Sequence, residues 1–377
     1  MNEVLYLSFD SLQEGVGASQ VLAYMRKIVK IRPVTIISFE KNMPKIELLN
    51  QVQKEGLKWT PLPFGRFGVI GGINRVIRMS RVVDRSKIIH ARSTSAGIAA
   101  LIRFPRMWIW DCRSLQADQR LALSASRRIS VSFILLRVSE YLLAKQSKSI
   151  IVITKAVIPV LITRYKISER KINCIPTCVD IVKFSEKPLG DVSEIRVLLA
   201  GTFSPAYDLE LTNKIIREMK RYRTVKVTIA ASTGDTGLWK SMEFDQVVSV
   251  KHDEMPQIIQ GHHIGMSIWK NDLGICLTSV ASTKTAEFLA CGRPVFINSL
   301  QGDFGNVIKQ GMVGVVTSGS STELVANYTK QILELINDPA LARRCHMVAV
   351  ERFNLDVGVH ILQKIYSTFD AASNQTS

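Results

Sequence analysis

The sequence predicts an α/β protein made of two doubly wound, Rossmann-like domains that face each other across a cleft. Three observations carry this prediction. Short runs rich in Val, Ile and Phe alternate with segments of helical length along nearly the whole chain, as in parallel sheets with helical crossovers. The alternation stops once, at 183–194, and then restarts. The length of 377 residues suits two domains of ordinary size.

The first series of strands fills the N-terminal half. Its members are continuous apolar runs, which are typical of parallel strands buried on both faces. Between the first two runs, residues 18–30 carry apolar side chains at helical spacing. The predicted strands are 4–9, 34–39, 57–63, 87–91, 107–111, 149–154 and 173–177.

The second series follows a polar segment without an apolar period, 183–194, which we interpret as a linker. Residues 1–182 then form an N-terminal domain and 195–355 a C-terminal one. The last helix, 356–370, is expected to pack back on the first domain. The predicted strands of the second series are 195–201, 226–232, 246–250, 264–269, 293–298 and 314–317.

The charge balance indicates an anionic partner. The chain has 49 Lys and Arg against 32 Asp and Glu, a net charge of +17. Nucleic acid is not expected, because the chain lacks zinc-finger spacing, an RNP-like aromatic motif and a basic arm. A phosphorylated ligand and an anionic membrane surface remain as the two candidates.

No apolar run is long enough for a transmembrane helix, and the first residues do not read as a signal peptide. We expect a cytoplasmic protein and leave open a peripheral position at the inner face of the membrane. The apolar helix predicted at 129–144 either packs on the sheet or presents a basic face to anionic lipid. Its flanking cations are Arg127, Arg128, Arg137, Lys145 and Lys148.

The six cysteines lack the paired short spacings of a metal site and are interpreted as buried free thiols. His263 is interpreted as structural. No Asp-x-Asp tripeptide occurs, so a metal held between two phosphates is not expected.

A glycine turn after the first strand is one candidate site. Gly15 and Gly17 precede a helix, where glycines let backbone N–H groups approach a phosphate or sugar. A tight turn without a ligand is the alternative. A dinucleotide fingerprint would need a small residue where Gln20 stands, although Glu40 could serve as its ribose-binding acid.

Residues 279–298 give a stronger signal, a short helix that Ser282 or Thr283 caps and Gly292 ends. Lys284 in its first turn opposes the helix dipole, which makes sense if an anion binds there. Glu287, one turn further, could accept hydrogen bonds from two ribose hydroxyls. The alternative is a surface ion pair between the two residues.

The motif TKTAEFLACGRPV at 283–295 resembles the donor-site helix of retaining, nucleotide-sugar-dependent glycosyltransferases of the GT-B fold, group 1 or family 4. Three further segments look like other parts of that family, so the resemblance covers most of the chain. They are 150–184 at the end of the first domain, 197–211 at the start of the nucleotide-binding domain and the closing segment 352–366.

The resemblance implies transfer of a sugar from a UDP- or GDP-type donor to an acceptor hydroxyl with retained anomeric configuration. It implies a glycan or lipid-linked acceptor, no cofactor and no metal, in the assembly of bacterial surface polysaccharide or glycolipid. In this family the glutamate of the motif holds the ribose, and the start of its helix holds the diphosphate. The implied donor-binding residues are Gly15, Gly17, Ser282, Thr283, Lys284 and Glu287.

Two departures from the family stand out. Many members carry another glutamate where this chain has Ser279, and many carry an Arg and a Lys that are absent from 201–211. Lys284 would supply part of that charge. Asp111 and Arg113 look like a variant D-x-R of a subgroup, which makes Asp111, Arg113 and Lys284 the candidate catalytic residues. A buried Asp–Arg pair that shapes a loop is the alternative.

Two other functions stay open because of these departures. One is a non-catalytic nucleotide-binding or assembly subunit, and the other is a sugar-nucleotide epimerase of the same fold. An oxidoreductase is disfavoured by Gln20.

Overall fold

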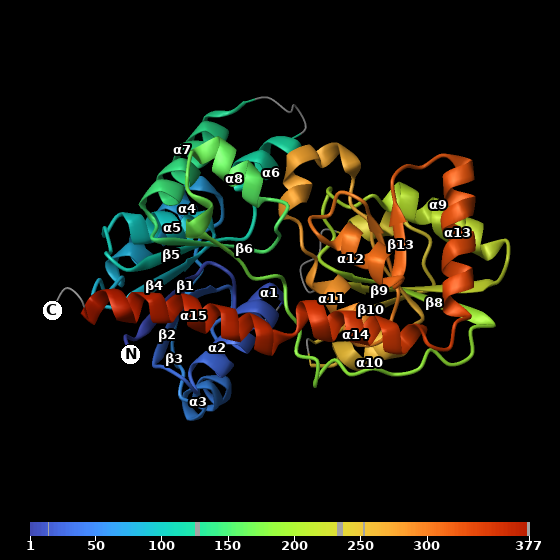
Figure 1. The fold of residues 1–377 in the computed structure, drawn as a ribbon, viewed down its shortest axis with the longest axis horizontal. Helices are drawn as coiled ribbons and strands as arrows, with labels where there is room; N and C mark the ends of the chain where they lie inside the picture. Colours follow the sequence, from blue (N-terminus) through green and yellow to red (C-terminus); the bar gives the residue numbers. More distant parts are fainter. Residues whose placement is uncertain (14, 125–128, 232–236, 252, 375–377) are drawn as a thin grey trace. The chain divides into compact units, whose positions relative to one another are not determined.

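We analysed a computed structural model of the chain, which describes residues 1–13, 15–124, 129–231, 237–251 and 253–374 (Figure 1). The chain forms two compact units. Unit 1 contains residues 1–175 and the C-terminal segment from Asp356, and unit 2 contains Pro176–Leu355. No helix among the described residues is long and apolar enough to cross a bilayer.

Unit 1 has a seven-stranded parallel sheet in the order β3-β2-β1-β4-β5-β6-β7. Its strands are β1 (Val4–Ser8), β2 (Val34–Glu40), β3 (Lys58–Pro63), β4 (Ile88–Arg92), β5 (Trp108–Cys112), β6 (Ser149–Val152) and β7 (Ile172–Cys174). Its helices are α1 (Gly15–Gly17), a π-helical turn (Ala18–Leu22), α2 (Ala23–Ile28), α3 (Ile46–Lys54), α4 (Gly68–Arg81), α5 (Ser93–Leu101), α6 (Gln116–Ala122), α7 (Val131–Gln146), α8 (Ile158–Tyr165) and α15 (Leu355–Asn374).

The strand order decides which face of this sheet each helix covers. The chain moves in one direction across the sheet from β3 to β7, and right-handed crossovers then place α4, α5, α7 and α8 on one face. The crossovers from β1 to β2 and from β2 to β3 run the other way, so α2 and α3 cover the opposite face. Helix α15 lies beside α2 (Figure 1).

Hydrogen bonds hold α15 in unit 1. Asp370 accepts from the backbone N–H of Asn2 at 2.8 Å and pairs with the buried guanidinium of Arg32 at 2.9 Å. The hydroxyl of Tyr366 and Nδ1 of His90 share a hydrogen bond of 2.7 Å. The C-terminal helix therefore completes the core of the N-terminal unit.

Unit 2 has a six-stranded parallel sheet in the order β10-β9-β8-β11-β12-β13. Its strands are β8 (Glu194–Gly201), β9 (Thr224–Ala231), β10 (Gln246–Ser249), β11 (Ile264–Ser267), β12 (Val295–Asn298) and β13 (Gly314–Thr317). Its helices are α9 (Leu209–Lys220), α10 (Met255–Gln260), α11 (Thr283–Ala290), α12 (Phe304–Gly311), α13 (Thr322–Ile336) and α14 (Leu341–Phe353), and two 3₁₀ segments span Leu238–Ser241 and Asn271–Ser279. Every strand predicted from the sequence is present, with ends shifted by a few residues.

The segment predicted as a linker, 183–194, lies within unit 2. The buried guanidinium of Arg293 donates to the carbonyls of Lys187 at 2.5 Å and Pro188 at 3.3 Å. Leu189 packs against the core of the same unit. The division falls between residues 175 and 176 instead. The segment lacks an apolar period because it contacts the rest of unit 2 largely through its own backbone carbonyls.

Candidate functional site

Each sheet has one point at which its strand order reverses, and open α/β sheets bind ligands outside the carboxyl ends of the strands at that point. It lies between β1 and β4 in unit 1 and between β8 and β11 in unit 2. The predicted site residues collect near these two points. They are Gly15, Gly17, Asp111 and Arg113 in unit 1, and Ser282, Thr283, Lys284 and Glu287 in unit 2.

The start of α11 is open to an external acceptor. Ser282 occupies the N-cap position, but its hydroxyl accepts no hydrogen bond from the first turn of the described helix. It accepts instead from the hydroxyl of Ser267 at 3.4 Å. Because the first N–H groups of a helix have no acceptor within the helix, Thr283 and Lys284 begin a helix whose positive end suits an anion.

Close packing fixes the position of α11 on the sheet. Gly265 in β11 leaves room for the ring of Phe288, which a Cβ atom would meet at 2.4 Å. The helix ends at Gly292, whose φ of +78° favours glycine. There the N–H groups of Gly292 and Arg293 donate to the carbonyls of Leu289 at 2.9 Å and Phe288 at 2.8 Å. The predicted end of the helix at Gly292 is confirmed.

Lys284 and Glu287 form an ion pair of 2.6 Å that is largely withdrawn from solvent. The Glu287 side chain is 1% exposed and that of Lys284 21% exposed. Among the described residues, Lys284 is the only hydrogen-bond partner of this carboxylate. A surface pair, the alternative considered above, does not describe it. A buried carboxylate with one donor retains capacity for more.

The cation of this pair lies beside the end of β8. The Cγ atom of Lys284 is 4.0 Å from the place of a Cβ atom on Gly201, whose φ is +130°. The Tyr207 hydroxyl lies 3.9 Å from the same place, and the ring of Tyr207 is 5.1 Å from that of Trp269. One edge of unit 2 thus combines a helix start, a cation, a buried acid and an aromatic wall.

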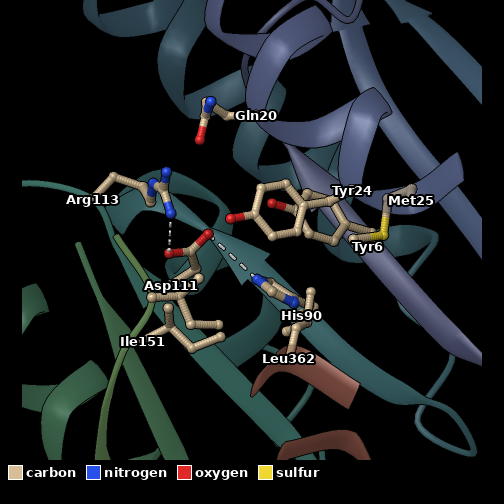
Figure 2. A pocket seen from close by; sticks show the side chains of 10 residues that line it. Tyr6, Gln20, Tyr24, Met25, His90, Asp111, Arg113, Ile151 and Leu362 are labelled. Carbon is tan, nitrogen blue, oxygen red and sulfur yellow. Dashed lines mark hydrogen bonds and ion pairs between the residues drawn. The ribbon is translucent and has the colours of Figure 1, made fainter. Parts of the chain in front are cut away.

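Unit 1 contains a pocket with a polar floor (Figure 2). Its empty volume is about 280 Å³, which includes space open to solvent. Strand register and the two-residue alternation place Tyr6, His90, Asp111 and Ile151 on one face of the sheet. Figure 2 shows Asp111 between Arg113 and His90, with Gln20 beyond the guanidinium.

Three basic side chains surround the Asp111 carboxylate. Oδ1 lies 3.4 Å from Nη1 of Arg113. Oδ2 lies 3.5 Å from Nη1 of Arg92 and 3.4 Å from Nε2 of His90. The last two nitrogens make no hydrogen bond to a described residue, although both are buried. Arg92 is also paired with Asp10 at 2.8 Å. Both nitrogens thus face the Asp111 carboxylate at ion-pair distance without a hydrogen bond to a described residue.

The charges of this pocket follow from burial and neighbours. Burial by itself raises the pKa of Asp111, but Arg113, His90 and Arg92 outweigh it and hold that pKa well below its usual range. Burial lowers the pKa of His90, against the opposing effect of Asp111. At neutral pH Asp111 is therefore a carboxylate that faces two guanidiniums and a neutral imidazole.

The glycine turn after β1 is closely packed. A Cβ atom on Gly17 would lie 1.8 Å from the carbonyl oxygen of Ser11, so the loop leaves no room for a side chain at Gly17. Gly15 has a φ of +55° and nothing within 4 Å of the corresponding place. Gly15 thus leaves open space at the start of α1, whereas Gly17 is required by the packing of the loop.

Glu40 does not have the orientation of a ribose-binding acid. It is buried, and its carboxylate accepts hydrogen bonds from Ser11 Oγ at 2.5 Å, Leu12 N at 3.0 Å, Gln13 Nε2 at 3.0 Å and Ser38 Oγ at 2.6 Å. Since four donors occupy it, Glu40 fixes the loop that leads to the glycine turn. The ribose-binding role considered for Glu40 is wrong.

Sequence reasoning found Asp111 and Arg113 but did not identify Arg92 and His90 as their neighbours. One signal was available: His90, Arg92 and Asp111 lie near the carboxyl ends of predicted neighbouring strands. Their meeting depends on the register of β4 against β5, which the sequence does not give.

The remaining polar candidates are structural. His263 is buried, its Nδ1 accepts from the backbone N–H of Arg196 at 3.0 Å, and burial lowers its pKa to about 4. The six cysteines are free thiols, and five of them are buried. Ser279 donates its hydroxyl to the carbonyl of Cys276 at 2.9 Å within the 3₁₀ segment.

No protein-family model and no curated protein matches the chain. Solved structures resemble it over nearly its whole length. A sucrose-phosphate synthase from Thermosynechococcus elongatus superposes with a TM-score of 0.74 at 13% identity, covering 99% of this chain and 100% of that one. HepE from Anabaena, solved with UDP and glucose, gives 0.69 at 16% identity over 98% of this chain and 100% of its own.

WaaG, a glycosyltransferase involved in lipopolysaccharide biosynthesis, gives a TM-score of 0.65 at 11% identity, covering 95% of this chain and 99% of that one. At such identities the likeness shows the fold. It confirms the predicted class, the GT-B fold with two Rossmann-like parallel-sheet domains.

Proposed function

We propose that the protein is a retaining glycosyltransferase that moves a sugar from a UDP- or GDP-type donor to an acceptor hydroxyl. The nucleotide binds at the start of α11 in unit 2, and the pocket of unit 1 binds the acceptor or the transferred sugar. Assembly of a bacterial surface polysaccharide or glycolipid is the proposed context. The fold shared with HepE and WaaG supports the class of reaction.

The observation that carries the proposal is the buried pair of Lys284 and Glu287 beside an uncapped helix start. A diphosphate would accept hydrogen bonds from the first N–H groups of α11 and from Lys284. Glu287 would then exchange its cation for the two hydroxyls of a ribose. After this exchange the buried Glu287 carboxylate would still have hydrogen-bond donors, two hydroxyls in place of one ammonium group.

The nucleotide is proposed from chemistry and from neighbours. The aromatic pair Tyr207 and Trp269 offers a flat surface near the same edge of unit 2. HepE was solved with UDP and with UDP-glucose. We therefore expect a response to UDP or GDP ahead of ADP, CMP or NAD.

The residues of unit 1 would orient the other substrate. Asp111 accepts hydrogen bonds in its charged state, Arg113 and Arg92 donate, and the neutral imidazole of His90 can donate or accept. A sugar presents several hydroxyls at once, so a pocket of mixed donors and acceptors suits it. In the proposed catalysis, Asp111 and Arg113 position the reacting groups.

Retention is proposed to proceed by attack on the face that the leaving phosphate vacates. The departing phosphate takes the proton of the acceptor hydroxyl, so no protein base is needed. Lys284 stabilises the charge that develops on the diphosphate. Because the chain itself supplies this cation and the N–H groups of α11, we propose that transfer needs no metal ion.

A nucleotide-binding subunit without activity is the second candidate. Ser279 stands where many members of the resembling family carry a glutamate, and its hydroxyl donates within its own segment. A transferase releases nucleoside diphosphate when an acceptor is present, an epimerase converts the donor sugar without an acceptor, and a binding subunit does neither.

The testing experiment is a thermal-shift panel of UDP, GDP, ADP, CMP and NAD on the wild-type chain and on Glu287→Ala. Ligands that bind only the folded state raise its apparent stability with concentration. UDP or GDP should raise the melting temperature. Glu287→Ala should weaken the binding of that nucleotide by about 10- to 100-fold, ~1 to 3 kcal/mol.

The control is Glu323→Ala, which removes an exposed glutamate from α13 of the same unit. It should leave the response unchanged. A Glu287→Ala protein that binds the nucleotide as tightly as the wild type would refute the ribose role.

A further inference from the structure

Helix α4 exposes an apolar face. Val69, Ile70, Ile73 and Ile77 follow each other at helical spacing and are all exposed, with Ile70 83% exposed. A surface helix ordinarily turns its apolar stripe to the core and its polar residues to water. Here the outward face of α4 is the apolar one.

The orientation of α4 is fixed by contacts on its inner face. Arg75 is buried and donates to the carbonyls of Phe64 at 3.1 Å and Arg66 at 2.8 Å, and its guanidinium lies 3.8 Å from the centre of the Phe64 ring. A Cβ atom on Gly71 would lie 1.9 Å from the Arg66 carbonyl oxygen. The helix therefore cannot rotate to bury the stripe without breaking these contacts.

Neighbouring residues extend the apolar face. Phe67, directly before α4, is 76% exposed. After α5, the turn at Ile102 and Phe104 is exposed as well, and Arg85 donates to the Phe104 carbonyl at 3.4 Å, which places this turn near the C-terminal end of α4. We call this set the α4 surface: Phe67, Val69, Ile70, Ile73, Ile77, Ile102 and Phe104.

The α4 surface lies in a strongly basic stretch of unit 1. Residues 56–110 contain ten Lys and Arg and a single acid, Asp84. Among the cations, Arg66, Arg103 and Arg106 are exposed close to the apolar residues. An apolar surface bordered by arginines matches a bilayer interface, where acyl chains lie below a layer of phosphates.

We propose that the α4 surface docks on an anionic lipid bilayer, with its apolar side chains in the interface and Arg66, Arg103 and Arg106 on lipid phosphates. A second copy of the chain fits less well, because two such surfaces would bring like charges together. This docking is independent of sugar transfer.

A second helix in the same layer also exposes apolar residues, which favours a flat, extended partner. Helix α7 lies on the same face of the sheet as α4, with α5 between them, and also exposes Val131, Ile134, Leu135 and Val138. A bilayer can contact both helices, whereas a single partner helix would cover one.

The basic face considered as an alternative for the helix at 129–144 is less suited to lipid than the α4 surface. Arg127 and Arg128 lie outside the described residues. Arg137 is paired with Asp118 at 2.8 Å, and Lys145 donates to the Lys166 carbonyl at 2.9 Å. These two cations are engaged with neighbouring residues, whereas Arg66, Arg103 and Arg106 near α4 are exposed.

The test is flotation of the full chain with vesicles of phosphatidylcholine alone and with vesicles containing 30% phosphatidylglycerol, a composition chosen to be anionic. At low salt the wild type should float with the anionic vesicles, and about tenfold less with the neutral ones. High salt should reduce flotation, because it screens the phosphate contacts. Equal flotation with both vesicles, or none, would overturn the proposal.

Two sets of variants locate the surface. Ile70→Glu with Ile73→Glu should reduce flotation at least tenfold, because charges enter the apolar stripe. Replacing Arg66, Arg103 and Arg106 by Gln should reduce it up to about fivefold for each charge removed. If either set floats like the wild type, the α4 surface is not the docking site.

The matched control is Ile46→Glu, which changes an exposed isoleucine in α3 on the opposite face of the sheet. It should float like the wild type. All variants alter exposed residues, so their melting temperatures should match that of the wild type. A Glu pair that abolishes a dimer seen without vesicles would instead indicate self-association. Nucleotide binding measured without lipid should be unchanged, which separates this proposal from the proposed function.

Discussion

Each unit buries a carboxylate near the carboxyl ends of its strands, and the two carboxylates differ in their partners. Asp111 in unit 1 has Arg92, Arg113 and His90 within 3.5 Å. Glu287 in unit 2 has Lys284 alone among the described residues. Asp111 therefore belongs to a network of charges, whereas Glu287 has a single partner and, in the proposed function, accepts further donors from the ligand.

The largest expected effect is on the free energy of unfolding, and it distinguishes Asp111 from Glu287. Asp111→Asn should lower the free energy of unfolding by about 3 kcal/mol, because Arg92 and Arg113 would keep buried charges with fewer partners. Glu287→Gln should cost about 1 kcal/mol or less, because the partly exposed Lys284 can turn to water. Urea denaturation followed by tryptophan fluorescence measures both. Equal losses would break the distinction between them.

Acid should destabilise unit 2 through a buried histidine. Its buried His263 has a pKa lowered to about 4 by burial and by Arg196, whereas Asp111 opposes the effect of burial on the pKa of His90. Between pH 6.5 and 4 the unfolded chain takes up a proton at His263 that the folded chain refuses, so stability falls as the pH falls. From pH 7 to pH 5 the loss is up to about 2 kcal/mol.

His263→Asn checks this assignment, because its side-chain oxygen can still accept from the Arg196 N–H while nothing titrates. We expect a smaller difference between the free energies of unfolding at pH 7 and pH 5. The same pH dependence in both proteins would show that His263 is not its source.

The third effect tests the proposed role of Lys284, the cation beside Glu287. Lys284→Ala should weaken the binding of UDP by about tenfold, ~1.4 kcal/mol, because a charged hydrogen bond to the diphosphate is lost. Uridine has no phosphate, so its affinity should not change. Titration calorimetry with both ligands measures the difference, and Lys330→Ala on the exposed side of α13 is the control. A parallel loss for uridine would assign Lys284 to the nucleoside instead.

Local patterns predicted elements well and contacts between elements less well. The strands follow from continuous apolar runs, and the end of α11 follows from Gly292, because both depend on neighbours in sequence. The partners of Asp111 depend on strand register, and Glu40 was misread because the donors that surround it come from a loop about 30 residues away.

The α4 surface shows a second limit. Apolar residues at 69, 70, 73 and 77 predict an amphipathic helix, but periodicity does not say which face the core covers. The face is decided by Arg75 and Gly71, whose contacts with the Arg66 carbonyl appear only in the folded chain.

The last prediction is that removal of metal ions does not change the affinity for UDP. If the N–H groups of α11 and Lys284 neutralise the diphosphate, then EDTA should leave UDP affinity unchanged, and added Mg²⁺ should not increase it. The reason is that each unit supplies its own positive charge: in unit 2 the start of α11 and Lys284 would face the diphosphate, and in unit 1 Asp111 already has two guanidiniums. Titration of UDP with EDTA and with Mg²⁺ measures this. A tenfold loss of affinity in EDTA would mean that the diphosphate is held through a metal, and that the start of α11 does not suffice.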